Sequence, residues 1–432
     1  MKTLLRSGFA AILVCAAARN ARAQDLAAGE PDTIRTWNGL ARDAVRTAKA
    51  ADVDAARTYA MVDVAIFDAV NGIVSRGPFG RTPALVPPDG APVIASLPAA
   101  AAAAARAVLA ALFPDQAARF DAQFAADLAA LDHRPGVDRG AAWGAAVGAQ
   151  VVAARAADGS RPVETVPAGS GPGVFRAAWS NAQFRNLVPF AVQDPAAFVS
   201  PPPPALDSVE YAGALNEVEV LGNAALPDPG LLATFQFWNL APGTDQPPGE
   251  WVGIALEVAG SRRVPFLDEA RLLALVSMAL ADVVAPTFQS KFLYAHWRPA
   301  TAINEADTDG NPATEADPAW KPRGGGIGGN PQHTSGHSAF SAAAATVLAG
   351  FFCRDDVAFA HQNDGAPGGA PRFYTGFSAA ALEAGRSRIF GGVHFEFSNQ
   401  AGLVAGRAVG AEILAGSLLR KAGPTHFGSC PL

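Results

Sequence analysis

The chain has 432 residues, of which 50% are hydrophobic, and its formal net charge is −6 at neutral pH. This length allows one large domain or two, with a sizeable core. An acidic chain without a basic run is a poor nucleic-acid binder, so any anion would have to be held by a local pocket.

Residues 1–23 are typical of a secretory signal. Two basic residues, Lys2 and Arg6, precede an apolar run, and Ala-Arg-Ala ends at residue 23 as a cleavage site. Cleavage would change the formal charge from −6 to −10, because four basic residues and no acidic residue are lost. No later stretch approaches the roughly 20 apolar residues of a spanning helix. We therefore expect an exported protein, periplasmic or secreted, without a membrane span.

Residues 24–205 are predicted to be an N-terminal helical region followed by a Pro-rich wrap. The wrap, from about Asp158 to Ala205, is rich in Pro and Gly, ends in SPPPPAL and lacks helical periodicity. Amphipathic spacing and Pro at helix starts mark the helices. The predicted helices cover Ile34–Ile73, Pro98–Leu112, Pro114–Leu131 and the stretch GAAWGAAVGAQVVAARAA.

Residues 206–432 are predicted to be a second helical region. Helices are expected from Ser208, over Leu267–Trp297, after Ser335 and over His394–Leu419. No convincing strand pattern occurs. The fold class is therefore all-α, with helical bundles and long Pro- and Gly-rich loops.

Two cations in SKFLYAHWRP are seven residues apart. Seven residues are two helical turns, so Lys291 and Arg298 are expected on one helix face, with Pro299 at the helix end or a kink. Two fixed cations on one face favour an anion, although most such pairs are solvated surface charges.

The stretch TSGHSAFSAAAATVLAGFF begins with capping residues. Thr334, Ser335 and Gly336 precede His337 where a helix has unpaired N–H groups and a positive dipole end. Such a helix start attracts anions.

The stretch SRIFGGVH holds Arg388 and His394, six residues apart. On a continuous helix they would face apart, but Gly391-Gly392 can break the helix and turn both inward. Arg388 offers a bidentate fork for an oxyanion, and His394 offers a ring nitrogen as ligand or nucleophile. Together the three segments match the needs of a tetrahedral oxyanion such as phosphate or vanadate.

The set KFLYAHWRP, SGH and SRIFGGVH resembles the vanadium-dependent haloperoxidases and the related type 2 phosphatidic acid phosphatase superfamily. The stretches AMVDVAIFDAVNGI, FWNLAPGTDQPPGEW and DTDGNPATEADPAW also resemble the secreted bacterial haloperoxidase-like branch. The resemblance covers most of the chain after residue 23 and implies helical bundles of the vanadium haloperoxidase and acid phosphatase type.

The resemblance also implies a cofactor and a site. Vanadate would be the cofactor, and phosphate would occupy the same site. His337 would be the acid–base residue that helps hydrogen peroxide bind, and His394 would coordinate vanadium. A halide would be oxidised to a hypohalous acid equivalent that reacts with a small organic acceptor. The residues assigned to the oxyanion are Lys291, Arg298, Ser335, Gly336, Arg388 and His394.

Two alternative functions use the same residues. In an acid phosphatase, His394 would attack phosphorus and His337 would protonate the leaving oxygen. In a non-catalytic oxyanion-binding protein, the cradle would bind without turnover.

Three positions depart from the family pattern. Ser398 stands where the phosphatases have an aspartate that orients the nucleophilic histidine, which weakens the phosphatase interpretation. The loop GGGIGGNPQHT replaces a Pro- and Tyr-containing loop. Asn330 stands where family members carry Phe or His, so halide preference is not transferred.

Several other residues receive structural interpretations. His333 and His296 are expected at the rim or facing away, and His133, His361 and His426 have no partner pattern. Asp307-x-Asp309-Gly310-Asn311 is predicted to be a polar turn and not a calcium loop. Cys353 and Cys430 either form a disulfide or stay free thiols.

Overall fold

The computed structural model describes residues 32–77, 80–131, 134–365 and 369–421. The predicted signal at residues 1–23 lies outside these ranges, and so do His133, His426 and Cys430. Export therefore stays a prediction.

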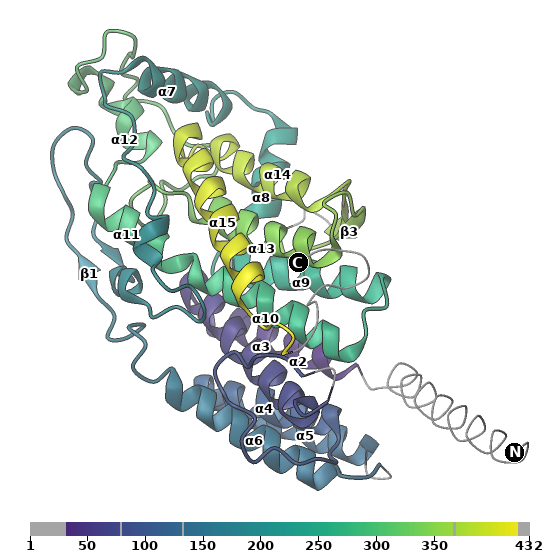
Figure 1. Ribbon diagram of the computed structural model, residues 1–432. Helices are drawn as coiled ribbons and strands as arrows, with labels where there is room; N and C mark the ends of the chain where they lie inside the picture. Colours follow the sequence, from purple (N-terminus) through teal and green to yellow (C-terminus); the bar gives the residue numbers. More distant parts are fainter. Residues whose placement is uncertain (1–31, 78–79, 132–133, 366–368, 422–432) are drawn as a thin grey trace, which may run out of the picture.

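The described chain is mostly helical (Figure 1). Its α-helices are α2 (Thr33–Ala48), α3 (Asp52–Val74), α4 (Leu97–Leu112), α5 (Ala117–Leu131), α6 (Val137–Ala154), α7 (Val209–Leu221), α8 (Pro229–Asn239), α9 (Gln246–Ser261), α10 (Phe266–Asp282), α11 (Val284–Tyr294), α12 (Pro299–Asn304), α13 (Gly336–Phe352), α14 (Phe377–Phe390) and α15 (Glu396–Gly416). The short 3-10 helices are η1 (Pro114–Gln116), η2 (Ala182–Asn186), η3 (Pro195–Phe198) and η4 (Ala306–Thr308). The all-α prediction is confirmed.

Strands are confined to two small antiparallel pairs among the described residues. β1 (Thr165–Val166) pairs with β2 (Trp179–Ser180), with Thr165 opposite Ser180. β3 (Phe359–His361) pairs with β4 (Arg372–Tyr374), with Ala360 opposite Phe373. Neither pair is long enough to form a layer.

The helices differ from the prediction in two ways. The expected helix over Ile34–Ile73 is divided into α2 and α3, because Lys49 adopts a left-handed conformation with φ 50° and ends α2. Helices α8 and α9 were not expected, since prolines surround them. Prolines occupy their first turns, where no intrahelical N–H is required.

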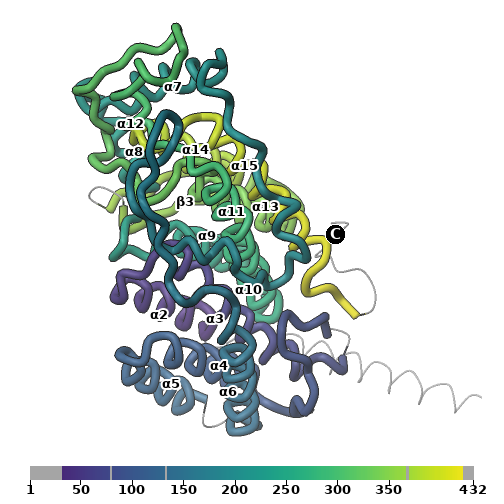
Figure 2. Tube along the Cα trace, turned by 90° about the vertical axis from the view of Figure 1, so that its left-hand side faces the viewer, coloured from purple at the N-terminus to yellow at the C-terminus, as the bar shows by residue number. Residues whose placement is uncertain are grey.

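Helix α3 is central in the N-terminal half. It packs against α4 and α6 on one side and against α10 on the other, and α4, α5 and α6 form one end of the molecule (Figures 1 and 2). Helices α7 and α12 lie at the opposite end. The large hydrophobic core runs from Ile34 to Leu418 and includes residues on both sides of the predicted division at residues 205 and 206. That division stays a prediction.

The Pro-rich wrap is held by buried polar contacts. The carboxylate of Asp282, at the end of α10, accepts hydrogen bonds from the backbone N–H groups of Phe190, Ala191 and Val192 at 2.6–2.9 Å. Ser200 donates its N–H to Ser290 on α11 at 3.0 Å. The wrap is thus fixed along α10 and α11 without helical structure of its own, because these donors would otherwise be buried unpaired.

Within the described ranges, one helical stretch, Phe266–Tyr294, is long and apolar enough to cross a membrane. It comprises α10 and α11, and nearly all of it is buried inside the fold, as in the core helix of a compact protein. Helix α13 contacts both α10 and α11 of this stretch. It also packs closely against α14 and α15.

Candidate active site

The predicted site residues, except Ser335, line one cavity of about 160 Å³. The cavity lies between the starts of α3 and α13, the end of α14 and one side of α11. Its walls comprise Asp52, Val284, Thr287, Phe288, Lys291, Arg298, Gly328, Gly329, Asn330, Gly336, His337, Phe340, Arg388 and His394. Ser335 is fully buried directly before this wall and caps α13, since its hydroxyl accepts from the N–H of Ser338 at 3.5 Å.

Lys291 and Arg298 converge on the cavity, but not from one helix face as predicted. Helix α11 ends at Tyr294, because Ala295 turns left-handed with φ 43°, and Arg298 immediately precedes α12. The prediction of a shared helix face is therefore wrong. Pro299 starts a new helix and does not end the earlier one.

Hydrogen bonds fix the Arg298 guanidinium. Its Nε donates to the carbonyl of Asn330 at 2.7 Å and its Nη2 to the Asn330 side-chain oxygen at 3.0 Å. Its Nη1 donates to the carbonyl of Val393 at 2.6 Å. Gly328 lies against the guanidinium, where a Cβ would come within 2.5 Å of Cζ. The Gly-rich loop thus lies closely over Arg298, and Asn330 has a positioning contact that sequence reasoning missed.

His337 lies in the first turn of α13, as the capping pattern predicted. Its Nε2 lies 3.2 Å from the carbonyl oxygen of Asn239. A carbonyl only accepts, so this contact places a proton on Nε2 and leaves Nδ1 as the basic nitrogen.

Arg388 and His394 both face the cavity because the helix breaks between them. Helix α14 ends at Phe390, and Gly392 adopts φ 74°, where a side chain would be strained. Arg298 Nη1 donates to His394 Nε2 at 3.1 Å. Because a guanidinium only donates, Nε2 is the unprotonated ring nitrogen of His394 and its lone pair faces Arg298. The prediction that the two glycines turn both residues inward is confirmed.

The cavity concentrates positive charge in a buried place. Burial, then the charge of Arg298, lowers the pKa of Lys291 well below its usual range. Burial lowers the pKa of Arg388 to about 9, and burial followed by the charge of Arg388 lowers that of Arg298 to about 9. Burial and then neighbouring cations lower the pKa of His337 and His394 well below the usual histidine value. Both histidines are therefore neutral near pH 7.

This donor set fits a tetrahedral oxyanion. Among the described residues, three buried cations share the wall of the cavity with one carboxylate, that of Asp52. The Nε of Arg388 is buried without a hydrogen-bond partner among the described residues. An unpaired buried donor and mutually repelling cations are costly, and an anion among them satisfies both.

Helix α8 supplies contacts that sequence reasoning missed. The side-chain oxygen of Asn239 accepts from Arg388 Nη1 at 3.1 Å, so Asn239 contacts both Arg388 and His337. The guanidinium of Arg388 also lies over the ring of Phe235, 4.9 Å from its centroid. The resemblance of FWNLAPGTDQPPGEW was the only signal for this segment. Asp52 and Thr287 had no signal in sequence spacing.

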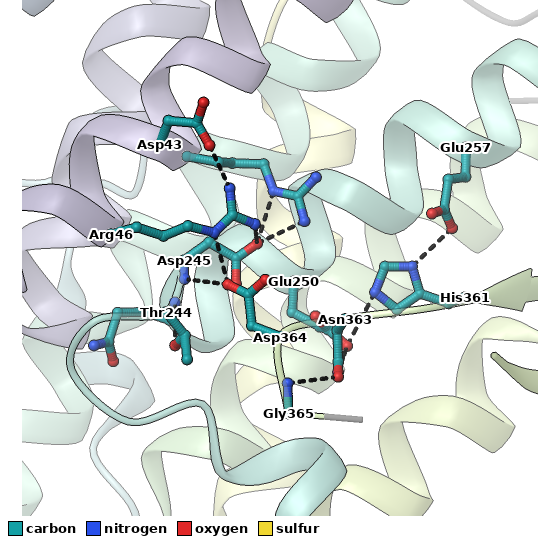
Figure 3. A network of polar contacts seen from close by, with 12 residues as sticks. Asp43, Arg46, Thr244, Asp245, Glu250, Glu257, His361, Asn363, Asp364 and Gly365 are labelled. Atoms are coloured by element: carbon teal, nitrogen blue, oxygen red, sulfur yellow. Dashed lines mark hydrogen bonds and ion pairs between the residues drawn. The ribbon is translucent and has the colours of Figure 1, made fainter. Parts of the chain in front are cut away.

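A buried polar network supports the segment after Asn239 (Figure 3). Asp245 pairs with Arg42 at 2.6 Å and with Arg46 at 3.2 Å. Glu250 lies 3.0 Å from His361, whose other ring nitrogen contacts Glu257 at 2.7 Å. His361, which sequence spacing left without a partner, is thus held between two carboxylates.

Asn363 links this network to α8. Its side-chain N–H donates to the carbonyl of Phe237 at 2.9 Å. Phe237 is two residues before Asn239 on α8. The network therefore helps to place the residue that contacts Arg388 and His337.

The remaining sequence candidates that the structure describes lie outside the cavity. His333 contacts the carbonyl of Pro201 at 2.9 Å, and His296 contacts Gln332 at 3.0 Å. Asp309 accepts from the N–H of Asn311 and from the hydroxyl of Thr314, so the predicted polar turn is confirmed.

Cys353 is disulfide-bonded. Cys430 lies outside the described residues, so their pairing stays a prediction.

Comparisons with known proteins bear on the fold. Residues 271–418 match the family model described as the VCPO second helical-bundle domain. No curated protein matches the chain. A bacterial vanadium-dependent iodoperoxidase is similar in structure, with a TM-score of 0.77 and 23% identity, over 91% of this chain and 100% of that chain.

Two structures of bacterial vanadium-dependent chloroperoxidase are also similar. The holo form has a TM-score of 0.65 and 15% identity over 85% of this chain and 92% of that chain. The apo form has a TM-score of 0.63 and 14% identity over 83% of this chain and 92% of that chain. The resemblance seen in the sequence is therefore confirmed: the chain has the fold of the vanadium haloperoxidase superfamily, whose second helical-bundle domain its residues 271–418 match.

Proposed function

We propose that this protein is a vanadate-dependent haloperoxidase that uses hydrogen peroxide to oxidise a halide. The observation that carries the proposal is the cavity that Lys291, Arg298 and Arg388 share with a neutral His394, whose Nε2 accepts from Arg298. When bound, vanadate supplies a V(V) centre that activates peroxide without changing its own oxidation state. The similar solved structures are vanadium-dependent enzymes, which supports this choice of oxyanion.

The residues have distinct roles in this proposal. Lys291, Arg298 and Arg388 neutralise the oxyanion charge, and Ser335 and the N–H of Gly336 add hydrogen bonds at the start of α13. His394 offers Nε2 as the ligand to vanadium. Arg298 is held before any ligand arrives, and its contact with Nε2 of His394 would have to be released for that nitrogen to bind vanadium.

His337 is the proton carrier. Its Nε2–H is engaged by Asn239, so Nδ1 is the nitrogen that takes a proton from hydrogen peroxide and later returns it. Its lowered pKa keeps it neutral in the absence of an anion, and a bound oxyanion would move that pKa upward by offsetting the cations.

An acid phosphatase is the second candidate, because the same cations suit a transferring phosphoryl group. One contact disfavours it. A nucleophilic histidine becomes positively charged when it attacks phosphorus, and a carboxylate at Nδ1 would offset that charge, but Nδ1 of His394 has no partner among the described residues. The hydroxyl of Ser398, where the phosphatase pattern has aspartate, donates to the carbonyl of Gln332 at 2.8 Å instead.

A paired assay tests the two functions. Purified protein is given hydrogen peroxide and bromide or iodide in one arm and a chromogenic phosphate monoester in the other, each with and without orthovanadate. We expect halide oxidation only with vanadate and its loss when phosphate competes. Ester hydrolysis that vanadate inhibits, without halide oxidation, would establish the phosphatase instead.

A further control identifies a non-catalytic binder. The His337→Ala variant is expected to lose turnover and to keep most of its phosphate affinity, measured by calorimetry. Full activity in this variant would contradict the role of His337. Anion binding without turnover in the unmodified protein, in both arms of the assay, would mean that the cradle only binds.

A further inference from the structure

The cavity holds a second polar feature away from the cations. Val284, Thr287 and Phe288 lie on the same face of α11 as Lys291, at helical spacings of three, four and seven residues. Phe340 from α13 and Asp52 from the start of α3 complete this part of the wall. The cavity therefore has a cationic end and an end with apolar walls, one carboxylate and one hydroxyl.

Asp52 has acceptor capacity that the fold does not use. One of its oxygens accepts the N–H of Val53 at 2.9 Å, which suits an acidic residue in the first turn of a helix. Within the described ranges no cation lies within ion-pairing distance of this carboxylate, although Lys291 and Arg388 act on it electrostatically. The half-buried carboxylate thus faces the cavity with an oxygen that helix capping does not require.

Thr287 is a second, independent observation. Its side chain is 4% exposed, and its hydroxyl is buried without a hydrogen-bond partner in the described part of the chain. A threonine inside a helix commonly donates to a carbonyl one turn earlier, and no such bond forms here. A buried hydroxyl without a partner carries an energetic cost that a ligand in the cavity would remove.

The cavity is not closed around the oxyanion. Its volume of about 160 Å³ corresponds to about five water molecules at about 30 Å³ each, most of which a tetrahedral oxyanion would replace. Asp52 on its wall is only half-buried, so a ligand beside the oxyanion can extend toward solvent there. The space that remains is bordered by Asp52, Thr287 and the apolar side chains.

We propose that Asp52 and Thr287 form a second subsite that binds a non-anionic hydrogen-bond donor, a hydroxyl or ammonium group of a small organic molecule, beside the oxyanion. A carboxylate accepts such a donor and repels a second anion, and Val284, Phe288 and Phe340 cover the apolar part of the molecule. The assignment of this molecule as the organic acceptor rests on the proposed haloperoxidase function. Binding at the subsite does not require that function.

The charged groups that face Asp52 set the sign of the expected effects. They are Lys291 from α11, Arg298 before α12, Arg388 from α14, and the neutral His337 and His394. Loss of the Asp52 charge leaves these cations unopposed. Affinity for an oxyanion should then rise, whereas affinity for a neutral donor should fall.

Ligand binding without turnover tests the subsite. Phenol, anisole and benzoate are titrated by ligand-observed NMR in saturating phosphate, without peroxide, halide or vanadate. Phenol donates a hydrogen bond, anisole has the same ring without a donor, and benzoate is an anion. We expect phenol to bind at least tenfold more tightly than either, and equal binding of the three would overturn the proposal.

Variants locate the binding. Asp52→Asn should weaken phenol binding about fivefold to tenfold, because a neutral acceptor replaces a charged one, and should strengthen phosphate binding. Thr287→Val should weaken phenol binding about threefold. The matched control is Asp54→Asn, which removes the same charge two residues away, where Asp54 pairs with Arg161 outside the cavity at 2.9 Å.

The opposite signs separate a ligand contact from a structural role. A variant that only damaged the fold would weaken the binding of phenol and of phosphate together. That result for Asp52→Asn would overturn the proposal. Identical effects of Asp52→Asn and Asp54→Asn on phenol binding would also overturn it. If Asp52→Asn does not fold, Thr287→Val and the ligand series on the unmodified protein decide. Failure of halide oxidation with intact phenol selectivity would refute the proposed function and leave the subsite standing.

Discussion

Two buried clusters of charge lie close together in this protein and have opposite character. In the network around Asp245, Glu250 and His361, each buried charge has an oppositely charged partner at 2.6–3.2 Å (Figure 3). Among the described residues, Lys291 and the two arginines of the cavity have no comparable partner, and Asp52 is the sole carboxylate on the wall. The charges of the first cluster are thus paired with one another, whereas those of the second are of one sign and favour an anion.

The largest effect is expected on turnover. His337→Ala removes the proton carrier and should lower kcat by about 10²–10⁴-fold, the usual contribution of a general acid–base residue. Steady-state halide oxidation with vanadate measures the loss. Since the cations remain, phosphate affinity should change by less than about threefold. A parallel loss of phosphate affinity would show that His337 acts mainly in binding.

Substitutions in the network around Asp245, Glu250 and His361 should change the stability of the protein and not its affinity for anions. His361→Gln leaves Glu250 buried without its cation, which should cost about 3–5 kcal/mol of unfolding free energy in urea denaturation. Glu257→Gln is the matched control, because Glu257 is 41% exposed and its loss should cost less than about 1 kcal/mol. Equal costs for the two variants would contradict the importance of burial in this network.

An oxyanion should complete the cavity. Phosphate at about 100 times its Kd should raise the unfolding free energy by about 2.7 kcal/mol, seen as an increase in Tm. Chloride at equal ionic strength is the control, since general screening would act through both salts. Equal shifts with the two salts would argue against a specific oxyanion site.

Removal of a single cation should lower binding and spare the fold. Arg388→Met removes one charge that faces the oxyanion, so phosphate affinity should fall about tenfold to hundredfold in calorimetry. Arg372→Met is the control, because Arg372 pairs with Glu383 at 2.8 Å outside the cavity. Without phosphate, Arg388→Met should be at least as stable as the unmodified protein, as repulsion is relieved. Marked destabilisation would instead give Arg388 a structural role.

The last prediction concerns pH and the same buried network. Burial opposes the charge on His361, but Glu250 and Glu257 outweigh it and raise its pKa to about 10. The stabilisation is therefore fully present below the unfolded histidine pKa of about 6.5 and is lost as pH rises toward 10. Urea denaturation between pH 6.5 and 10 should show this decline, and His361→Gln should flatten it. An unchanged slope in the variant would place the titrating group elsewhere.

Sequence reasoning found the site because the chemistry is carried by short local patterns. Ser335 and Gly336 open α13, and Gly391-Gly392 end α14 beside His394, as expected from capping and glycine rules. The same reasoning placed Lys291 and Arg298 on one helix. It could not foresee the left-handed turn at Ala295, because alanine carries no sequence signal for that conformation.

The sequence by itself thus determined the all-α class, most helix starts and the residue types that demand an oxyanion. These features depend on local propensity and on side-chain chemistry, which are written in neighbouring residues. Only the tertiary structure decided that Asn239 contacts both Arg388 and His337, that Asn330 fixes Arg298, and that Asp52 and Thr287 face the same cavity. Such contacts join residues far apart in the chain, and packing of the helices, not sequence spacing, brings them together.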